Sequence, residues 1–153
     1  MVRHVEGKKA CPSPQTAKII SDFVYNRTND VTEFLSVTFP PEWINTHPNY
    51  LETIPSSSEI VNSNILVQQF NAVENWLARN WSGACTELSK ISRPVLIITG
   101  TEDVAVPAAN SLMLVQNIPD AWLVQIRDAG HGLMYRYPDE FSRIISTFMN
   151  TTN

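Results

Sequence analysis

The sequence predicts a mixed α/β fold, with a mostly helical first half (residues 1–89) followed by a strand–helix–strand–helix unit (residues 90–153). Three observations support this prediction. Before Lys90, apolar residues recur at helical spacing. After it come two short apolar runs, PVLIIT and WLVQI. A proline then opens a helical segment after each run. We therefore expect a helical region joined to a small parallel sheet.

The first half predicts helices interrupted by prolines. Residues 15–25 fit one short helix, and Asp30 with Glu33 forms a capping-box pattern at the start of NDVTEFLSV. The segment FPPEWINTHPNY predicts a short helical turn with a break at each end. Ser56 and Glu59 form a second capping pair before a longer helix. Its apolar positions are Val61, Ile65, Leu66, Phe70, Val73 and Leu77. No strand is expected before residue 90.

The second half changes to the pattern of a βαβ unit. PVLIIT is short, apolar and rich in β-branched residues, as is typical of a strand buried on both faces. Pro107 opens a helix of about ten residues, and WLVQI is the second strand. Pro138 opens the last helix, where Asp139 and Glu140 favour the positive end of the helix dipole. Its apolar stripe is Phe141, Ile144, Ile145 and Phe148.

Composition and charge exclude several classes of function. The 153 residues carry a formal net charge of −4, which argues against a general binder of nucleic acid or anionic membranes. No apolar run approaches the length of a membrane span. The N-terminal segment MVRHVEGKKACPSPQ lacks the apolar core of a secretory signal, so a cytoplasmic location is favoured.

No cofactor or metal site is expected from the cysteines and histidines. Cys11 and Cys85 are the two cysteines, and neither a CxxC nor an HxxxH spacing occurs. A nucleotide-binding βαβ unit is disfavoured because GTEDVAVP contains neither GxGxxG nor a Walker pattern.

Asp103 and His131 are the candidate functional residues. In a βαβ unit the two strands run parallel, so their carboxyl ends lie at the same edge of the sheet. Asp103 follows the first strand and His131 the second, so we expect the carboxylate to accept the imidazole N–H. Gly130 and Gly132 would let the backbone turn sharply and leave the ring exposed. The alternative is an ordinary turn aspartate and a surface histidine. His4 and His47 lack this context and are expected to be structural or solvated.

Residues 91–149 resemble the C-terminal part of an α/β-hydrolase. PVLIITGTEDVAVP resembles the strand and loop that carry the catalytic acid, and WLVQIRDAGHGLMYRYPDEFSRIISTFM resembles the last strand, the histidine loop and the final helix. The resemblance implies that Asp103 is the triad acid and His131 the general base. It also implies that residues 1–89 are a lid over a pocket for a small-molecule substrate. Candidate pocket residues are Phe39, Trp43, Trp76 and Met134. The alternative for the aromatic residues is ordinary lid core.

The nucleophile motif of the α/β-hydrolases is missing from this sequence. The family's elbow is GxSxG, but no two of the glycines, at positions 7, 83, 100, 130 and 132, are four residues apart. We therefore expect a partial α/β-hydrolase fold, a helical lid followed by a C-terminal βαβα unit, that is not catalytically competent alone. Two parallel strands should leave an apolar face and edge open. The alternative is a small non-catalytic interaction module that self-associates through the exposed sheet edge.

Overall fold

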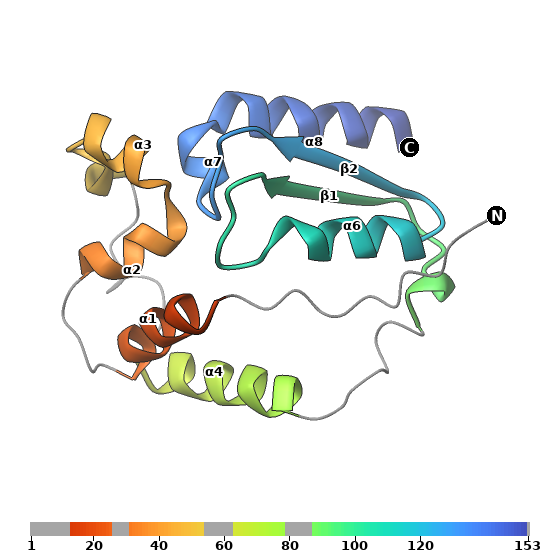
Figure 1. Cartoon of the computed structure of the whole chain (residues 1–153). Helices are drawn as coiled ribbons and strands as arrows, with labels where there is room; N and C mark the ends of the chain where they lie inside the picture. The colour runs from red at the N-terminus through yellow and green to blue at the C-terminus, as the bar shows by residue number, and fades with distance from the viewer. Residues whose placement is uncertain (1–12, 26–30, 54–62, 79–86, 153) are drawn as a thin grey trace.

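The computed structural model describes residues 13–25, 31–53, 63–78 and 87–152 (Figure 1). Its elements, in chain order, are α1 (Pro14–Val24), α2 (Val31–Thr38), α3 (Pro41–Thr46), the 3-10 turn η1 (Tyr50–Thr53), α4 (Ser63–Ala78), the 3-10 turn η3 (Leu88–Lys90), β1 (Val95–Gly100), α6 (Ala108–Asn117), β2 (Ala121–Ile126), α7 (Leu133–Arg136) and α8 (Pro138–Thr152). The order agrees with the predicted helical half and βαβα half. The short helix α7 was not predicted.

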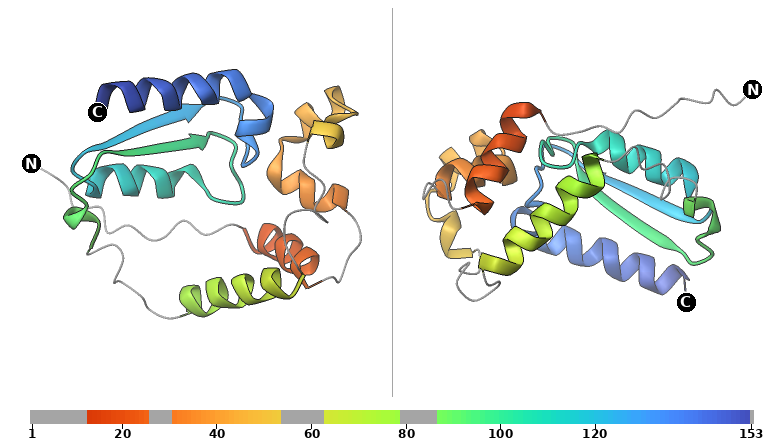
Figure 2. Two further views of the ribbon diagram at one scale, coloured as in Figure 1. Left: turned by 180° about the vertical axis from the view of Figure 1, so that it is seen from behind. Right: turned by 90° about the horizontal axis from the view of Figure 1, so that it is seen from below.

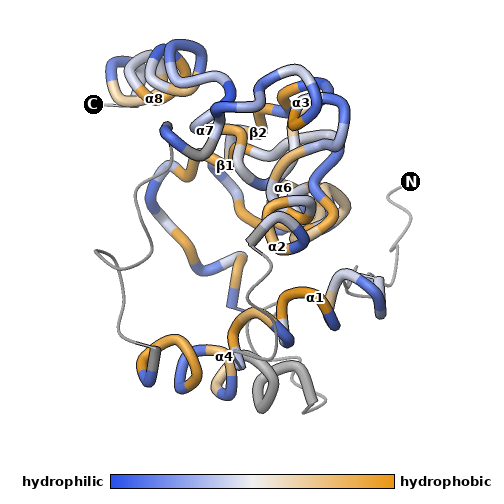
Figure 3. Tube along the Cα trace, turned by 90° about the vertical axis from the view of Figure 1, so that its left-hand side faces the viewer, coloured by the Kyte–Doolittle hydropathy of each residue, from blue (hydrophilic) through white to orange (hydrophobic). Residues whose placement is uncertain are grey.

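The first half is helical, as predicted, and no strand occurs in its described ranges. Ser13 begins α1 by accepting a hydrogen bond from the Thr16 backbone N–H at 3.1 Å. Pro40 lies between α2 and α3, and Pro41 is the first residue of α3. Figure 3 shows both apolar and polar residues along the coloured part of α4. The predicted caps Asp30 and Ser56 lie outside the described residues.

A cluster of aromatic and aliphatic side chains forms the core of the helical half. Its buried members are Leu35, Phe39, Trp43 and Tyr50, with Ile44 packed against them. The rings of Phe39 and Trp43 stack with centroids 4.6 Å apart. Phe39 is only 1% exposed, which makes it the most deeply buried large side chain among the described residues. This cluster fixes the turn between α2 and α3.

The second half contains a two-stranded parallel sheet. Strands β1 and β2 pair from Val95 opposite Ala121 to Gly100 opposite Ile126. The sheet lies between α6 and α8 in the views of Figures 1 and 2. On the α8 side, the rings of Trp122 and Phe148 meet edge to face at 5.6 Å. The predicted strands and both long helices of this half are confirmed.

The expectation that β1 is buried on both faces is wrong for most of its length. Residues 95–98 are half-buried, and Thr99 and Gly100 alone are fully buried. Among the described residues, the sheet has two strands, so each strand has one edge without a neighbouring strand. Trp122 remains 36% exposed. The apolar sheet is therefore incompletely covered, as two strands alone predict.

The glycines at this end of the sheet serve close packing. No described glycine has a positive φ angle, so Gly130 and Gly132 are not required by a left-handed backbone conformation. A Cβ on Gly100 would lie 2.0 Å from the Ala129 carbonyl oxygen, and one on Gly132 would lie 2.5 Å from the Phe39 ring. Because glycine has no side chain, the loop after β2 can approach both β1 and the helical half.

We expect Gly100→Ala to lower the free energy of unfolding by roughly 1–3 kcal/mol, because the new methyl group meets backbone rather than a flexible side chain. Urea unfolding followed by circular dichroism measures the change. Ser142→Ala, at an exposed position of α8, is the control and should change stability by less than about 0.5 kcal/mol. Equal stability of Gly100→Ala and the parent would contradict the close approach.

Candidate active site

Asp103 and His131 meet beyond the carboxyl ends of the two strands. Asp103 follows β1 and His131 follows β2, and parallel pairing brings both loops to one edge of the sheet. The Nδ1 atom of His131 lies 3.0 Å from Oδ2 of Asp103, across 28 residues of sequence. Because an ionised carboxylate can only accept, Nδ1 is the donor in this hydrogen bond. Nε2 of the neutral ring is then left as a proton acceptor.

The Asp103 carboxylate is held in a fixed orientation. Its side chain is only 6% exposed. The second carboxylate oxygen, Oδ1, accepts a hydrogen bond from the Val106 backbone N–H at 2.7 Å. One oxygen is thus fixed by the turn that follows β1, and the other points at the imidazole. This arrangement suits a carboxylate that orients a histidine.

His131 is more accessible than its partner, with 51% of its side chain exposed. The hydrogen bond that His131 donates to Asp103 raises the pKa of His131 above its ordinary value of 6.5, burial opposes the rise, and the charge of the carboxylate adds to it. All these effects are expected of an imidazole that stands in a shallow site beside a buried acid. The ring can therefore receive a proton and keep it more readily than a free histidine.

The loop that carries His131 is anchored on the helical half. The Gly132 backbone N–H donates to the Thr38 carbonyl oxygen at the end of α2, at 2.8 Å. A Cβ on Gly130 would lie 2.7 Å from the same oxygen. The end of α2 thus contacts the loop on both sides of the histidine. Sequence periodicity does not reveal this contact, because it joins segments about 90 residues apart.

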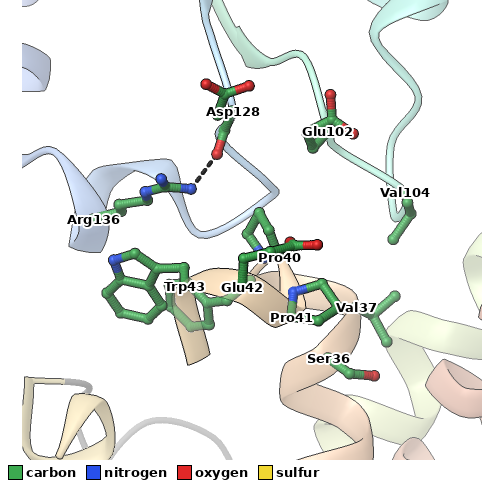
Figure 4. A pocket seen from close by; sticks show the side chains of 11 residues that line it. Ser36, Val37, Pro40, Pro41, Glu42, Trp43, Glu102, Val104, Asp128 and Arg136 are labelled. Atoms are coloured by element: carbon green, nitrogen blue, oxygen red, sulfur yellow. Dashed lines mark hydrogen bonds between the residues drawn. The ribbon is translucent and has the colours of Figure 1, made fainter. Parts of the chain in front are cut away.

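An open pocket of about 580 Å³ lies between the α2–α3 turn and the loops after β1 and β2 (Figure 4). Its lining residues are Ser36, Val37, Phe39, Pro40, Pro41, Glu42, Trp43, Glu102, Val104, Asp128 and Arg136. Two of them, Glu102 and Val104, are the chain neighbours of Asp103. The charged residues of this lining were not predicted, since they belong to no motif and lie in loops or short helices.

The candidate pocket residues differ in whether they line this pocket. Phe39 and Trp43 line this pocket, but they are 1% and 9% exposed and belong to the core of the helical half. Met134, in α7, is 40% exposed and does not line the pocket. Trp76 lies in α4, and its side chain is outside the described residues. Of the other histidines, His47 stacks on Trp43, and His4 lies outside the described residues.

Neither a membrane-spanning helix nor a metal-binding cluster of side chains occurs among the described residues. No helix there is both long and apolar enough to cross a bilayer. Within the same ranges, no group of three or more His, Cys, Asp or Glu side chains is arranged to hold a metal ion.

Curated relatives of this chain are hydrolases. The chain is 38% identical over 55 residues to the pimeloyl-[acyl-carrier protein] methyl ester esterase of Nitrosomonas europaea, a match that spans 36% of the chain and 22% of the esterase. It is 26% identical over 115 residues to a protein of Pseudomonas syringae named as the carbamate hydrolase RutD. This match spans 74% of the chain and 42% of that relative. The chain thus covers less than half the length of these relatives.

Solved structures show the same fold. An α/β-hydrolase from a deep-sea metagenome library of the Medee basin superposes with a TM-score of 0.67 at 20% identity, over 95% of this chain and 55% of that one. The 2-hydroxy-6-oxo-6-phenylhexa-2,4-dienoate hydrolase of Rhodococcus sp. strain RHA1 gives 0.61 at 19% identity, over 95% and 52%. The chain thus has the architecture of about half of an α/β-hydrolase.

A protein family described as TAP-like protein, of the α/β-hydrolase type, matches residues 74–153, which include β1, β2 and both loops of the candidate site. This match extends over more than half of the chain. The chain belongs to this family of α/β-hydrolases.

Proposed function

We propose that Asp103 and His131 are the acid and general base of a hydrolytic site that acts on esters, amides or related bonds of small molecules. The observation that carries the proposal is the 3.0 Å hydrogen bond between His131 Nδ1 and Asp103 Oδ2 at the carboxyl edge of the sheet. The names of the relatives, an esterase and a carbamate hydrolase among them, support a hydrolytic reaction.

The proposed chemistry follows from the orientation of the imidazole. Nε2 of His131 takes the proton of an attacking hydroxyl, whose oxygen forms a bond to the substrate carbonyl carbon. Asp103 stabilises the imidazolium. The proton then passes from Nε2 to the leaving group as its bond to the carbonyl carbon breaks. Water, activated by the same base, hydrolyses the acyl intermediate and restores the hydroxyl.

The attacking group is not among the residues assigned to this site. The 153 residues contain no GxSxG, so we propose that the nucleophile is supplied by polypeptide beyond this sequence. In subtilisin, loss of the nucleophile alone costs about as much as loss of the whole triad. The 153 residues by themselves should therefore show almost no turnover of this kind.

The natural protein, isolated from its source cells with an antibody to α8, should hydrolyse a simple ester such as p-nitrophenyl acetate. We expect His131→Ala to lower kcat by at least about 10³-fold, because the general base is lost. The intact mass of the isolated protein shows whether the additional polypeptide is part of the same chain.

His47→Ala is the matched control. This histidine is exposed, stacks on Trp43, and its Nδ1 lies 3.0 Å from the Trp43 carbonyl oxygen. Its loss should leave kcat within about 2-fold of the parent. Unchanged turnover in His131→Ala would refute the assigned role.

The pH dependence of kcat/KM should report the titration of His131. The base acts when neutral, so the rate rises as the pH passes upward through the pKa of His131, which the Asp103 hydrogen bond holds above 6.5. Asp103→Asn removes that stabilisation of the imidazolium. We expect the midpoint of the profile to move to lower pH and the plateau to fall by about 10³–10⁴-fold. A midpoint that stays in place would contradict the pairing.

Self-association through the sheet edge is a second candidate function. It is favoured by the apolar strand β1, whose residues 95–98 remain half-buried in a sheet of two described strands. A second copy could pair with this edge or cover its apolar face. Such a module would need neither a nucleophile nor a substrate.

Size-exclusion chromatography with light scattering of the 153-residue chain distinguishes this candidate. Self-association predicts a dimer of twice 17.2 kDa that melts cooperatively and dissociates on dilution. Ile97→Lys, in the middle of β1, should shift it toward the monomer. A soluble, cooperatively folded monomer across micromolar concentrations would eliminate the candidate.

A further inference from the structure

We propose that Thr101 and Arg136 are positioning residues: their side chains hold the backbone of Asp128 and thereby place His131 against Asp103. The inference rests on the proposed function for the role of the pair, but its structural part is tested without turnover.

Asp128, the second residue after β2, occupies an unusual backbone conformation. Its φ angle is 56°, and it is the one described non-glycine residue with a positive φ. This left-handed conformation is unfavourable for a residue with a Cβ, although aspartate tolerates it better than most. Asp128 lies three residues before His131, so its backbone angles set the direction in which the histidine loop leaves the strand. The conformation needs support from its surroundings.

Thr101 supplies that support at the backbone amide. The Asp128 N–H donates to the Thr101 hydroxyl oxygen at 2.9 Å, across 27 residues of sequence. Thr101 lies two residues before Asp103, in the loop that follows β1. The hydrogen bond therefore ties the loop of the acid to the loop of the base through a side chain.

Arg136 supports the other side of the same residue. Its Nη1 donates to the Asp128 carbonyl oxygen, as the dashed line in Figure 4 shows. Arg136 is the last residue of α7, and its guanidinium also lies 4.9 Å from the ring centroid of Tyr137. The amide and the carbonyl of Asp128 are thus both held by side chains, one from before the histidine loop and one from after it.

Backbone hydrogen bonds around the histidine loop link the position of Asp128 to the position of His131. The Glu102 N–H donates to the Ala129 carbonyl oxygen at 2.9 Å, and Gly132 is bonded to Thr38. Ala129 follows Asp128 directly, so a change in the Asp128 backbone angles also displaces the Ala129 carbonyl. The displacement is then taken up before the Gly132–Thr38 hydrogen bond, by residues that include His131. A hydrogen bond of 3.0 Å weakens steeply when its angle or length changes. Loss of either side chain should therefore loosen the Asp103–His131 contact.

The test is an NMR titration of the His131 ring in the 153-residue chain. His131→Ala assigns the signal among the three histidines. We expect Thr101→Val, which keeps the shape but removes the hydroxyl, to move the pKa of His131 down toward 6.5, and Thr101→Ser to retain the raised pKa. A folded Thr101→Val protein with an unchanged His131 pKa would overturn the proposal, since a purely structural role lowers stability without moving the titration.

Arg136→Met gives an independent arm if Thr101→Val does not fold. Removing a positive charge would by itself raise the pKa of a nearby histidine, whereas loss of positioning lowers it, so the two causes give opposite signs. A downward shift supports the proposal, and an upward shift or none overturns it. In the natural protein, both variants should lower kcat by about 10–100-fold with KM nearly unchanged. Full activity of His131→Ala would refute the proposed function while leaving the titration result intact.

Discussion

The parallel pairing of β1 with β2 is the constraint on which the candidate site depends. Because both strands end at the same edge, the loops that follow them must share the space beyond it. The last pair, Gly100 opposite Ile126, sets how closely they meet. Without a side chain on Gly100, the Ala129 carbonyl can approach and accept the Glu102 amide at 2.9 Å. The contact between Asp103 and His131 is a consequence of that approach.

The helical half also contributes to the placement of the histidine loop. Phe39 is the most buried large side chain of its aromatic cluster, and its ring fills the space beside Gly132. The Thr38 carbonyl accepts the Gly132 amide in the same place. Packing in the helical half and placement of the histidine loop are therefore coupled, because one short segment, Thr38 and Phe39, contributes to both. The pocket beside it is bounded by residues from both halves for the same reason.

Local patterns in the sequence were enough to predict the strands, the long helices and the meeting of Asp103 with His131. Apolar runs and prolines mark these elements, and the parallel βαβ rule then places the two loops. The role of Gly130 and Gly132 was not predictable in this way. It depends on the distance between segments about 90 residues apart, which no periodicity encodes. The same applies to Arg136 and Asp128, since a side-chain bond to a carbonyl leaves no sequence motif.

Asp103 and His131 are held by contacts that lie within the 153 residues. The Asp103 carboxylate is fixed by the Val106 amide, and the loop of His131 is fixed by Thr101 and Thr38. The sheet beneath them is incompletely covered, yet the residues nearest the pair, Thr99 and Gly100, are its buried end. The geometry of the pair therefore does not depend on the additional polypeptide that, on the proposed function, would supply a nucleophile. A partner that docks against a preformed acid–base pair loses less free energy to ordering the site than one that must assemble it. On the proposed function, completing the sheet would add the attacking group to an imidazole that is already oriented.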